Sequence, residues 1–382
     1  MSHIIAYSGA RIFDGEAWHD DAALVVVDGV VHSIGVAPAD ATHVALDSGV
    51  LAPGLIDLQV NGGAGHLVGP ATTADDLALV CATHRAFGVT GLLPTLITDT
   101  AEVTDAVLAA GAEAARRRVP GFLGLHLEGP HLSLARKGAH DPALIRPMDE
   151  ADLQRLERAR AALPHLLVTV AAETVAPEQI ARLVRAGVVV SIGHSDASFE
   201  ITSAAIRAGA GMATHLFNAM SQIGNRDPGV VGAALHHGRV WAGLIADGIH
   251  VNPATLRLAL RAKNGPGRIF LVSDSMSQAG TDMSSFMLNG RTIYRKDGAL
   301  RLGDGTLAGA DLTLDAAVRY MHQVFGMELG DCLKMASLYP AEAIGAAGLG
   351  RLRPGDAGDF VWFGEGLRAQ PLPSPLRGEG GA

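Results

Sequence analysis

Three residues of this sequence, Glu128, His194 and His215, are of the types that bind a catalytic divalent metal. Each of them closes an apolar run, the clearest being Gly121-Phe-Leu-Gly-Leu-His-Leu-Glu128. One carboxylate oxygen and two imidazole nitrogens can hold a metal ion while leaving positions open for water or substrate. A single buried histidine is more often an imidazole satisfied by the main chain. Three such residues, each at the end of a different strand, favour a metal site.

Asp274 follows the apolar run Ile269-Phe-Leu-Val272 and lies between two serines. At the same rim it could act as general base on a metal-activated water, and then as general acid to the leaving group. A helix N-cap or an ion pair is the structural alternative for this carboxylate.

These side chains need a scaffold that brings several strand ends to one rim. Apolar runs predict eight strands, at 51–61, 89–97, 121–128, 166–173, 188–193, 211–216, 240–246 and 268–273. Amphipathic stretches between them predict helices, for example at 73–87, 100–118, 177–186, 198–208 and 253–263. Eight strand–helix units in about 220 residues predict an α/β protein with a (β/α)8 TIM-like barrel, whose chemistry lies on the loops after the strands. A doubly wound open sheet is disfavoured, because it would gather polar residues at one crevice rather than at six or more strand ends.

Short strands and tight turns flank the predicted barrel on both sides. We therefore expect a small β-sandwich domain built from both chain ends, with residues 1–50 and 349–368 on either side of a catalytic barrel at 51–348. The Pro/Gly-rich residues 369–382 have the composition of a disordered tail, which would leave the β domain without an edge strand.

Composition excludes several classes of function. The net charge is −9, and no basic cluster is longer than Arg116-Arg117-Arg118, which argues against a nucleic-acid partner. Cys81 and Cys332 have no CxxC spacing, so neither a disulfide framework nor a cysteine metal site is indicated. With no signal peptide or long apolar run, we expect a cytoplasmic protein with no membrane partner.

Several motifs together resemble the N-acetylglucosamine-6-phosphate deacetylases of the amidohydrolase superfamily. They occur in the family's order, from about residue 3 to residue 365, and comprise Pro53-Gly-Leu-Ile-Asp57, Leu125-His-Leu-Glu-Gly-Pro130, Gly193-His-Ser195, Thr214-His-Leu-Phe-Asn-Ala-Met220, Ala246-Asp-Gly-Ile-His250 and Val272-Ser-Asp-Ser275. The Pro-Gly-Leu-Ile-Asp motif is typical of the whole superfamily. The motifs at 125–130 and 214–220 together indicate a much smaller group of proteins within it.

The resemblance implies metal ligands at Glu128, His194 and His215, and a catalytic carboxylate at Asp274. It also implies that His140 and His250 contact the sugar or the acyl carbonyl, which His140 would polarise. Arg226 would bind the phosphate, and Asn218 and Ala219 would add polar and main-chain contacts in the same pocket. Arg226 would reach the phosphate across a homodimer interface. A guanidinium fork suits a phosphate dianion. On the sequence alone, however, a solvated surface charge is the more common role for a residue such as Arg226, and a loop imidazole for His140.

One departure concerns the number of metal ions. Many amidohydrolases carry His-x-His at the end of strand one, but this chain has Gln59-Val-Asn61. Because amides are weak metal ligands beside imidazole, we expect one divalent metal per subunit, with zinc first and iron, manganese or cobalt as alternatives. Gln59 and Asn61 would instead hydrogen-bond a water near the site.

The predicted function is metal-dependent hydrolysis of N-acetylglucosamine 6-phosphate to glucosamine 6-phosphate and acetate, in amino-sugar catabolism or recycling. One alternative is a deacetylase of a related substrate, such as N-acetylgalactosamine 6-phosphate or an N-acyl amino acid. Another is a non-catalytic metal-binding sensor of sugar phosphates, although such a sensor has no need of a proton-transfer carboxylate beside the metal.

Overall fold

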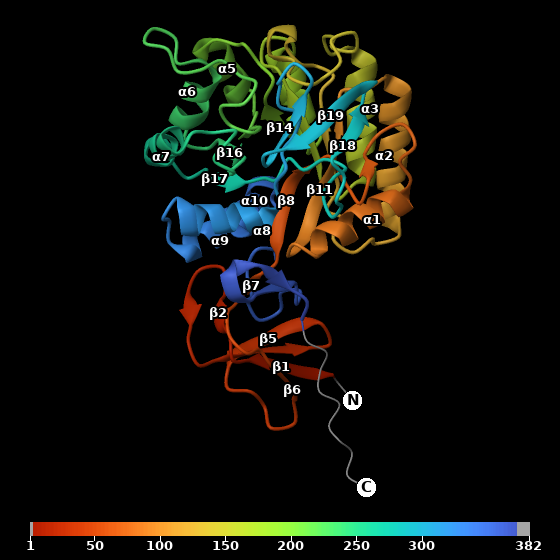
Figure 1. Cartoon of the computed structure of the whole chain (residues 1–382). Helices are drawn as coiled ribbons and strands as arrows, with labels where there is room; N and C mark the ends of the chain where they lie inside the picture. Colours follow the sequence, from red (N-terminus) through yellow and green to blue (C-terminus); the bar gives the residue numbers. More distant parts are fainter. Residues whose placement is uncertain (1–2, 373–382) are drawn as a thin grey trace.

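The computed structural model describes residues 3–372 and contains an eight-stranded parallel sheet (Figure 1). Its strands pair in chain order: β8 (Leu55–Val60), β11 (Val89–Ile97), β12 (Leu125–Glu128), β13 (Leu166–Val170), β14 (Val189–Ile192), β15 (Met212–Ala213), β16 (Trp241–Leu244) and β17 (Ile269–Leu271). Just beyond these strands, the main-chain N–H groups of Asn61 and Asp274 donate to the carbonyls of Ser275 and Gln59. These bonds close the sheet into a barrel. The predicted TIM-like barrel is confirmed, although most strands are shorter than predicted.

Helices cover the outside of the barrel, as the amphipathic pattern predicts. They are α1 (Ala74–Arg85), α2 (Ala101–Arg116), α3 (Glu150–Ala162), α4 (Pro177–Arg185), α5 (Phe199–Arg207), α6 (Gly229–His236) and α7 (Pro253–Ala262). Thr73 and Asp149 begin α1 and α3 with capping boxes, which satisfy N–H groups that a helix start leaves unpaired. The barrel strands carry mainly Val, Leu and Ile, and these side chains are buried in one continuous core.

The chain after the last barrel strand forms several short helical segments. It forms α8 (Leu314–Arg319), a π-helical turn at Tyr320–Val324, α9 (Leu329–Ala336) and α10 (Leu338–Ile344). Ser337 separates α9 from α10 because its main chain leaves the helical region, with φ −132° and ψ −70°.

Two further sheets share a hydrophobic core below the barrel in Figure 1. One contains β5 (Val30–Gly35), β4 (Ala23–Val27), β1 (Ile4–Ser8) and β6 (Thr42–Ala45); the other contains β22 (Ala369–Gln370), β21 (Phe360–Phe363), β7 (Val50–Pro53), β2 (Arg11–Phe13) and β3 (Trp18–His19). Both chain ends therefore build the small β part, as predicted. The domain boundaries at 50 and 348 stay a prediction.

The predicted tail at 369–382 is wrong at its first two residues. Ala369 and Gln370 form β22, which pairs with Phe363 and Trp362 of β21, so the sheet gains the edge strand that the composition did not suggest. The rest of this prediction, from residue 373, lies outside the described residues.

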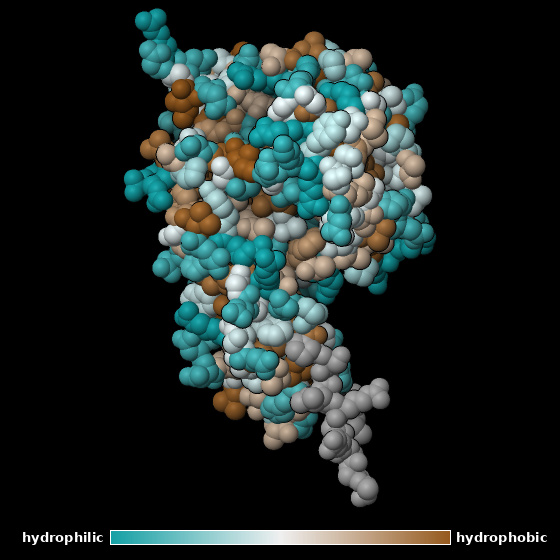
Figure 2. All heavy atoms as spheres, viewed as in Figure 1, coloured by the Kyte–Doolittle hydropathy of each residue, from teal (hydrophilic) through white to brown (hydrophobic). Residues whose placement is uncertain are grey.

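A separate three-stranded sheet lies against the upper barrel in Figure 1. It consists of β18 (Ser285–Leu288), β19 (Arg291–Lys296) and β20 (Ala299–Leu302), and it follows the last barrel strand. Hydrophobic and hydrophilic side chains are interspersed over the face shown in Figure 2. Within residues 3–372, no helix is long and apolar enough to cross a bilayer.

Candidate metal centre and active site

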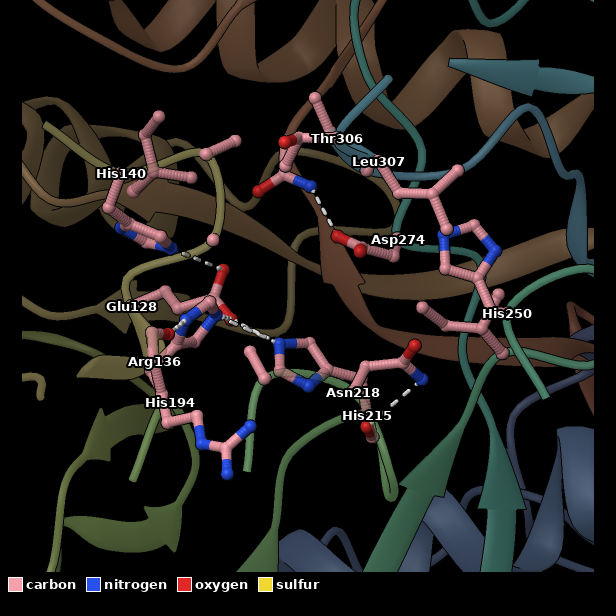
Figure 3. Close-up of a pocket in the computed structure, with 18 of the residues that line it drawn as sticks. Glu128, Arg136, His140, His194, His215, Asn218, His250, Asp274, Thr306 and Leu307 are labelled. Carbon is pink, nitrogen blue, oxygen red and sulfur yellow. Dashed lines mark hydrogen bonds and ion pairs between the residues drawn. The ribbon is translucent and has the colours of Figure 1, made fainter. Parts of the chain in front are cut away.

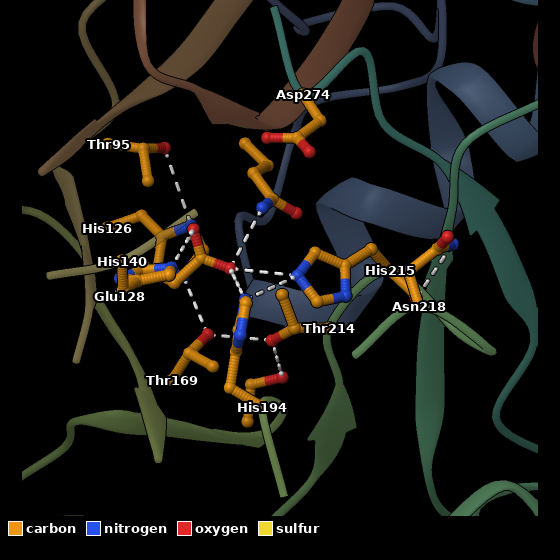
Figure 4. A network of polar contacts seen from close by, with 12 residues as sticks. Thr95, His126, Glu128, His140, Thr169, His194, Thr214, His215, Asn218 and Asp274 are labelled. Carbon is orange, nitrogen blue, oxygen red and sulfur yellow. Dashed lines mark hydrogen bonds and ion pairs between the residues drawn. The ribbon is translucent and has the colours of Figure 1, made fainter. Parts of the chain in front are cut away.

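Glu128, His194 and His215 converge at the carboxyl ends of the barrel strands (Figure 4). Oε1 of Glu128 lies 3.0 Å from Nε2 of His215 and 3.3 Å from Nε2 of His194, and the two nitrogens are 3.1 Å apart. All three side chains are buried. Ligands bonded at about 2.0–2.1 Å to one tetrahedral metal would be about 3.3 Å apart. Because three lone-pair atoms face one another at that spacing, the residues present fit a divalent cation.

Neighbouring groups orient these three side chains. Nδ1 of His194 donates to the carbonyl of Arg136 at 2.8 Å, which leaves the Nε2 lone pair facing the cluster. The amide of Gln59 donates to Oε1 of Glu128 at 3.2 Å. Gly193 lets the strand end approach its neighbours, since a Cβ there would lie 2.8 Å from side-chain atoms of both Thr169 and Thr214.

Contacts within the cluster shift the pKa values of Glu128 and His215 in the direction opposite to the effect of burial. Burial would raise the pKa of Glu128, but its close contacts with the imidazoles of His194 and His215 hold it well below its usual range. Burial would likewise lower the pKa of His215, yet the hydrogen bond and the charge of Glu128 raise it. The carboxylate therefore stays ionised, as a metal ligand must.

Two of these ligands and the predicted base share an unusual backbone conformation. His194, His215 and Asp274 have φ values of 46°, 31° and 50°. Non-glycine residues rarely adopt this left-handed region, and when they do they cluster at functional sites. The turn after each strand aims its side chain into the barrel mouth.

His140 faces the same cluster from the loop after β12. The N–H of Thr98 donates to its Nδ1 at 3.3 Å, and the Thr98 hydroxyl lies 2.8 Å from the same atom. Nδ1 is thus the acceptor, and the proton belongs on Nε2, which lies 3.9 Å from Oε2 of Glu128. Burial, followed by the charge of His194, lowers the pKa of His140 to about 3, so this imidazole is a neutral hydrogen-bond donor.

Asp274 lies on the opposite side of the pocket from His140 (Figure 3). Its Oδ1 accepts a hydrogen bond from Nδ2 of Asn61 at 2.7 Å. Burial, together with the nearby charge of Glu128, raises the pKa of Asp274 to about 6. A carboxyl group with this pKa can both accept and return a proton near neutral pH.

A pocket of about 340 Å³ contains most of the predicted site residues. The side chains or main chain of these residues line it: Asn61, Glu128, His140, His194, His215, Asn218, Ala219, His250 and Asp274. Gln59 does not line the pocket and instead donates a hydrogen bond to Glu128. Arg226 is exposed in the loop between β15 and α6, and it does not line the pocket of its own chain.

The structure adds residues that the sequence analysis did not select. Asp247 is one, because its Oδ2 accepts a hydrogen bond from Nδ1 of His250 at 2.6 Å; its place in Asp-Gly-Ile-His was the available signal. His126 is another; it is buried, and Figure 4 shows it beside Glu128 in the network of polar contacts. Its Nε2 lies 2.7 Å from the hydroxyl of Thr169.

Comparison with known proteins gives consistent matches along almost the whole chain. A family model described as "Amidohydrolase family" matches residues 50–375. The chain is 40% identical over 365 residues to the N-acetylgalactosamine-6-phosphate deacetylase of Shewanella sp. (strain ANA-3), covering 94% of this chain and 92% of that protein. It is 37% identical over 334 residues to the Homo sapiens N-acetylglucosamine-6-phosphate deacetylase, covering 84% and 81%.

Solved structures of other proteins resemble this structure over almost the whole chain. N-acetylglucosamine-6-phosphate deacetylase from Pasteurella multocida superposes with a TM-score of 0.92 at 33% identity, covering 96% of this chain and 97% of that one. A mutant of the Mycobacterium smegmatis enzyme, in complex with N-acetyl-D-glucosamine-6-phosphate, gives 0.88 at 32% identity and covers 96% of both chains.

Proposed function

This chain belongs to the amidohydrolase family, and on that premise we propose that it hydrolyses N-acetylglucosamine 6-phosphate to glucosamine 6-phosphate and acetate. The observation that carries the proposal is the presence of a metal-type ligand set, a proton-transfer carboxylate and a neutral imidazole donor in one pocket. Relatives named for deacetylation of phosphorylated amino sugars support it, since they match this chain over most of their length.

Glu128, His194 and His215 would hold the cation, one per subunit. The donor set accepts zinc, which we propose first, and also iron, manganese or cobalt. When bound, a divalent cation supplies Lewis-acid chemistry, which lowers the pKa of a coordinated water to about 7. Gln59 and Asn61 stand where many relatives have two further histidines, so we propose that no second cation is bound.

The protein's own residues would carry the proton and orient the acyl group. Asp274 takes a proton from the attacking water and returns it to the nitrogen of the departing amine. Nε2–H of His140 donates to the acetyl oxygen, where negative charge develops. Because Asp274 and His140 face each other across the pocket, the acetamide would lie between them.

The sugar phosphate would be held at the outer part of the pocket. We propose that His250, Asn218 and the main chain of Ala219 contact it, with Asp247 fixing the ring of His250. Arg226 does not line the pocket of its own chain, so we propose that it reaches the phosphate of a second copy in a homodimer. A cytoplasmic location is part of the same proposal.

A second candidate substrate is N-acetylgalactosamine 6-phosphate. Two relatives named for this epimer are 40% and 37% identical over 94% and 97% of this chain. The same catalytic groups would serve either epimer, since the two sugars differ only at a hydroxyl remote from the acetamide.

Acetate release tests the proposal directly. Purified protein of measured metal content is incubated with both phosphorylated epimers, with the same sugars lacking the phosphate, and with an N-acyl amino acid. We expect acetate from the phosphorylated sugars and a large loss of kcat/KM without the phosphate. No acetate from any of them, with metal bound, would instead indicate a sensor.

A further inference from the structure

Asn61, just after β8, has one side-chain atom with no partner. Its side chain is 3% exposed and lines the pocket. Nδ2 donates to Oδ1 of Asp274 at 2.7 Å, whereas Oδ1 of Asn61 is buried without a hydrogen-bond partner among residues 3–372. A buried acceptor left unpaired is costly, and in native proteins it calls for an explanation.

The orientation of this amide follows from its neighbour. An ionised carboxylate only accepts hydrogen bonds, so the NH2 group of Asn61 must face Asp274. The amide oxygen therefore points away from Asp274, and it is buried within a residue that lines the pocket. Gln59 offers a contrast on the same strand, because it is equally buried but gives its NH2 group to Glu128 and does not line the pocket.

We propose that Oδ1 of Asn61 accepts a hydrogen bond from the N–H of the scissile acetamide, an inference that rests on the proposed function. To protonate the departing nitrogen, Asp274 must contact it. Asn61 is hydrogen-bonded to that same carboxylate, so a nitrogen that contacts Asp274 would be placed next to the Asn61 amide group.

This contact sets the direction in which the nitrogen is protonated. The water oxygen forms a bond to the acetyl carbon, and the water proton passes to Asp274. When the C–N bond breaks, its electron pair stays on nitrogen, and Asp274 returns the proton to that pair. With its N–H held by Asn61, the nitrogen turns the new lone pair towards Asp274. The free amine leaves, and the acetic acid gives the second water proton to solvent and leaves as acetate.

A pair of substrates separates this role from general damage to the site. The N-acetyl sugar phosphate has the N–H, whereas its 2-O-acetyl ester counterpart has none. Asn61→Leu should slow both, because Asp274 loses its donor, but it should lower the amide-to-ester ratio of kcat by about tenfold or more. Asn61→Asp keeps an acceptor oxygen, so the ratio should change by less than about threefold, although repulsion from Asp274 slows both substrates.

Gln59→Leu is the matched control, since it removes a buried amide from the same strand and should leave the ratio unchanged. Metal content and circular dichroism are measured for each variant, and Asn61→Ala replaces Asn61→Leu if the latter does not fold. An unchanged ratio in the folded Leu or Ala variant, or an equal loss in Asn61→Asp, overturns the inference while the proposed function stands. Failure of the unaltered protein to release acetate from the amide overturns both.

Discussion

At the scale of single residues, hydrogen bonds decide which atom each imidazole presents to the pocket. His194 gives its Nδ1 proton to the carbonyl of Arg136, so its Nε2 is a lone-pair ligand. His140 receives the N–H of Thr98 at Nδ1, so its Nε2 is a proton donor. An imidazole therefore acts as a lone-pair ligand at His194 and as a proton donor at His140. Hydrogen bonds with main-chain groups of distant residues determine which nitrogen has the proton.

Asp274→Asn should abolish proton transfer while keeping the pocket intact. The amide cannot take a proton from water, so we expect kcat to fall by about 10²–10⁴-fold. Metal content and the dissociation constant of the substrate, measured by calorimetry, should stay within a few-fold of the unaltered protein. Near-normal turnover would end the assignment of Asp274 as the base.

Glu128→Ala should release the metal rather than merely slow the reaction. Glu128 is the sole carboxylate of the three-residue cluster, and the two histidines alone make a weaker site. We expect metal affinity to fall by more than about 10²-fold, as measured by dialysis followed by elemental analysis. Glu178→Ala, at an exposed position of α4, is the control. A fully metallated Glu128→Ala protein would contradict the ligand assignment.

His140 should stay neutral across the working pH range. Burial lowers its pKa to about 3, so nitrogen-15 spectra should show a proton on Nε2 and a bare Nδ1 between about pH 5 and pH 8. An unfolded chain binds this proton near pH 6.5. The neutral ring therefore contributes stability at neutral pH that is lost as the pH falls through 6.5 towards 3. An imidazolium signal at pH 6 would refute this prediction.

At the scale of elements, short segments after the strands bring the site together. The loop that carries His140 is held by the three-stranded sheet β18–β20, because the guanidinium of Arg291 donates to the carbonyl of Ala139. The same sheet contributes Leu288 to the pocket wall. A sheet far from the ligands in sequence therefore positions the imidazole that would polarise the substrate.

Arg291→Met should loosen this loop without removing any group that touches the substrate. We expect kcat/KM to fall by about 10- to 100-fold, because a misplaced catalytic group is costly, while metal content and the melting temperature change little. Arg301→Met is the matched control, since Arg301 is exposed on β20 and its guanidinium donates to the carbonyl of Gly305 in its own sheet region. Equal losses in both variants would show that the sheet, not the Ala139 contact, is responsible.

The strands and their polar ends could be predicted because each carries its own local pattern of apolar residues followed by a turn. Hydrogen bonds between residues that are far apart in the sequence have no such local pattern. Thr98 and His140 are 42 residues apart, and Arg136 and His194 are 58 apart. The edge strand β22 was missed because Ala369 and Gln370 have little intrinsic strand propensity. Pairing with β21 stabilises them instead.

At the scale of the whole molecule, the pocket and the small β part lie at opposite ends of the barrel. β7 runs directly into β8, so the small β part adjoins the amino end of the first barrel strand, while Glu128 and the histidines follow carboxyl ends. Arg226 is exposed near the pocket end of the barrel. The small β part therefore does not cover the pocket end of the barrel.

Two inactive variants should recover activity when they are combined in one dimer, if Arg226 acts across the dimer interface. Arg226→Ala keeps Asp274, and Asp274→Asn keeps Arg226, so a mixed dimer contains one complete site. Co-expression in equal amounts should recover about a quarter of normal activity, since half of the dimers are mixed and each has one working site. Size-exclusion chromatography checks the dimer. If each subunit completes its own site, no activity will return.

The position of β7 has a consequence for synthesis on the ribosome. β7 pairs with β2 on one edge and with β21 on the other, and about 300 residues separate Pro53 from Phe363. At 5–20 residues per second, one edge of β7 waits about 15–60 s for its partner. During that time a hydrophobic strand edge is open to other nascent chains, so the amount of soluble protein made in a cell depends on what shields β7 until translation reaches the last strands.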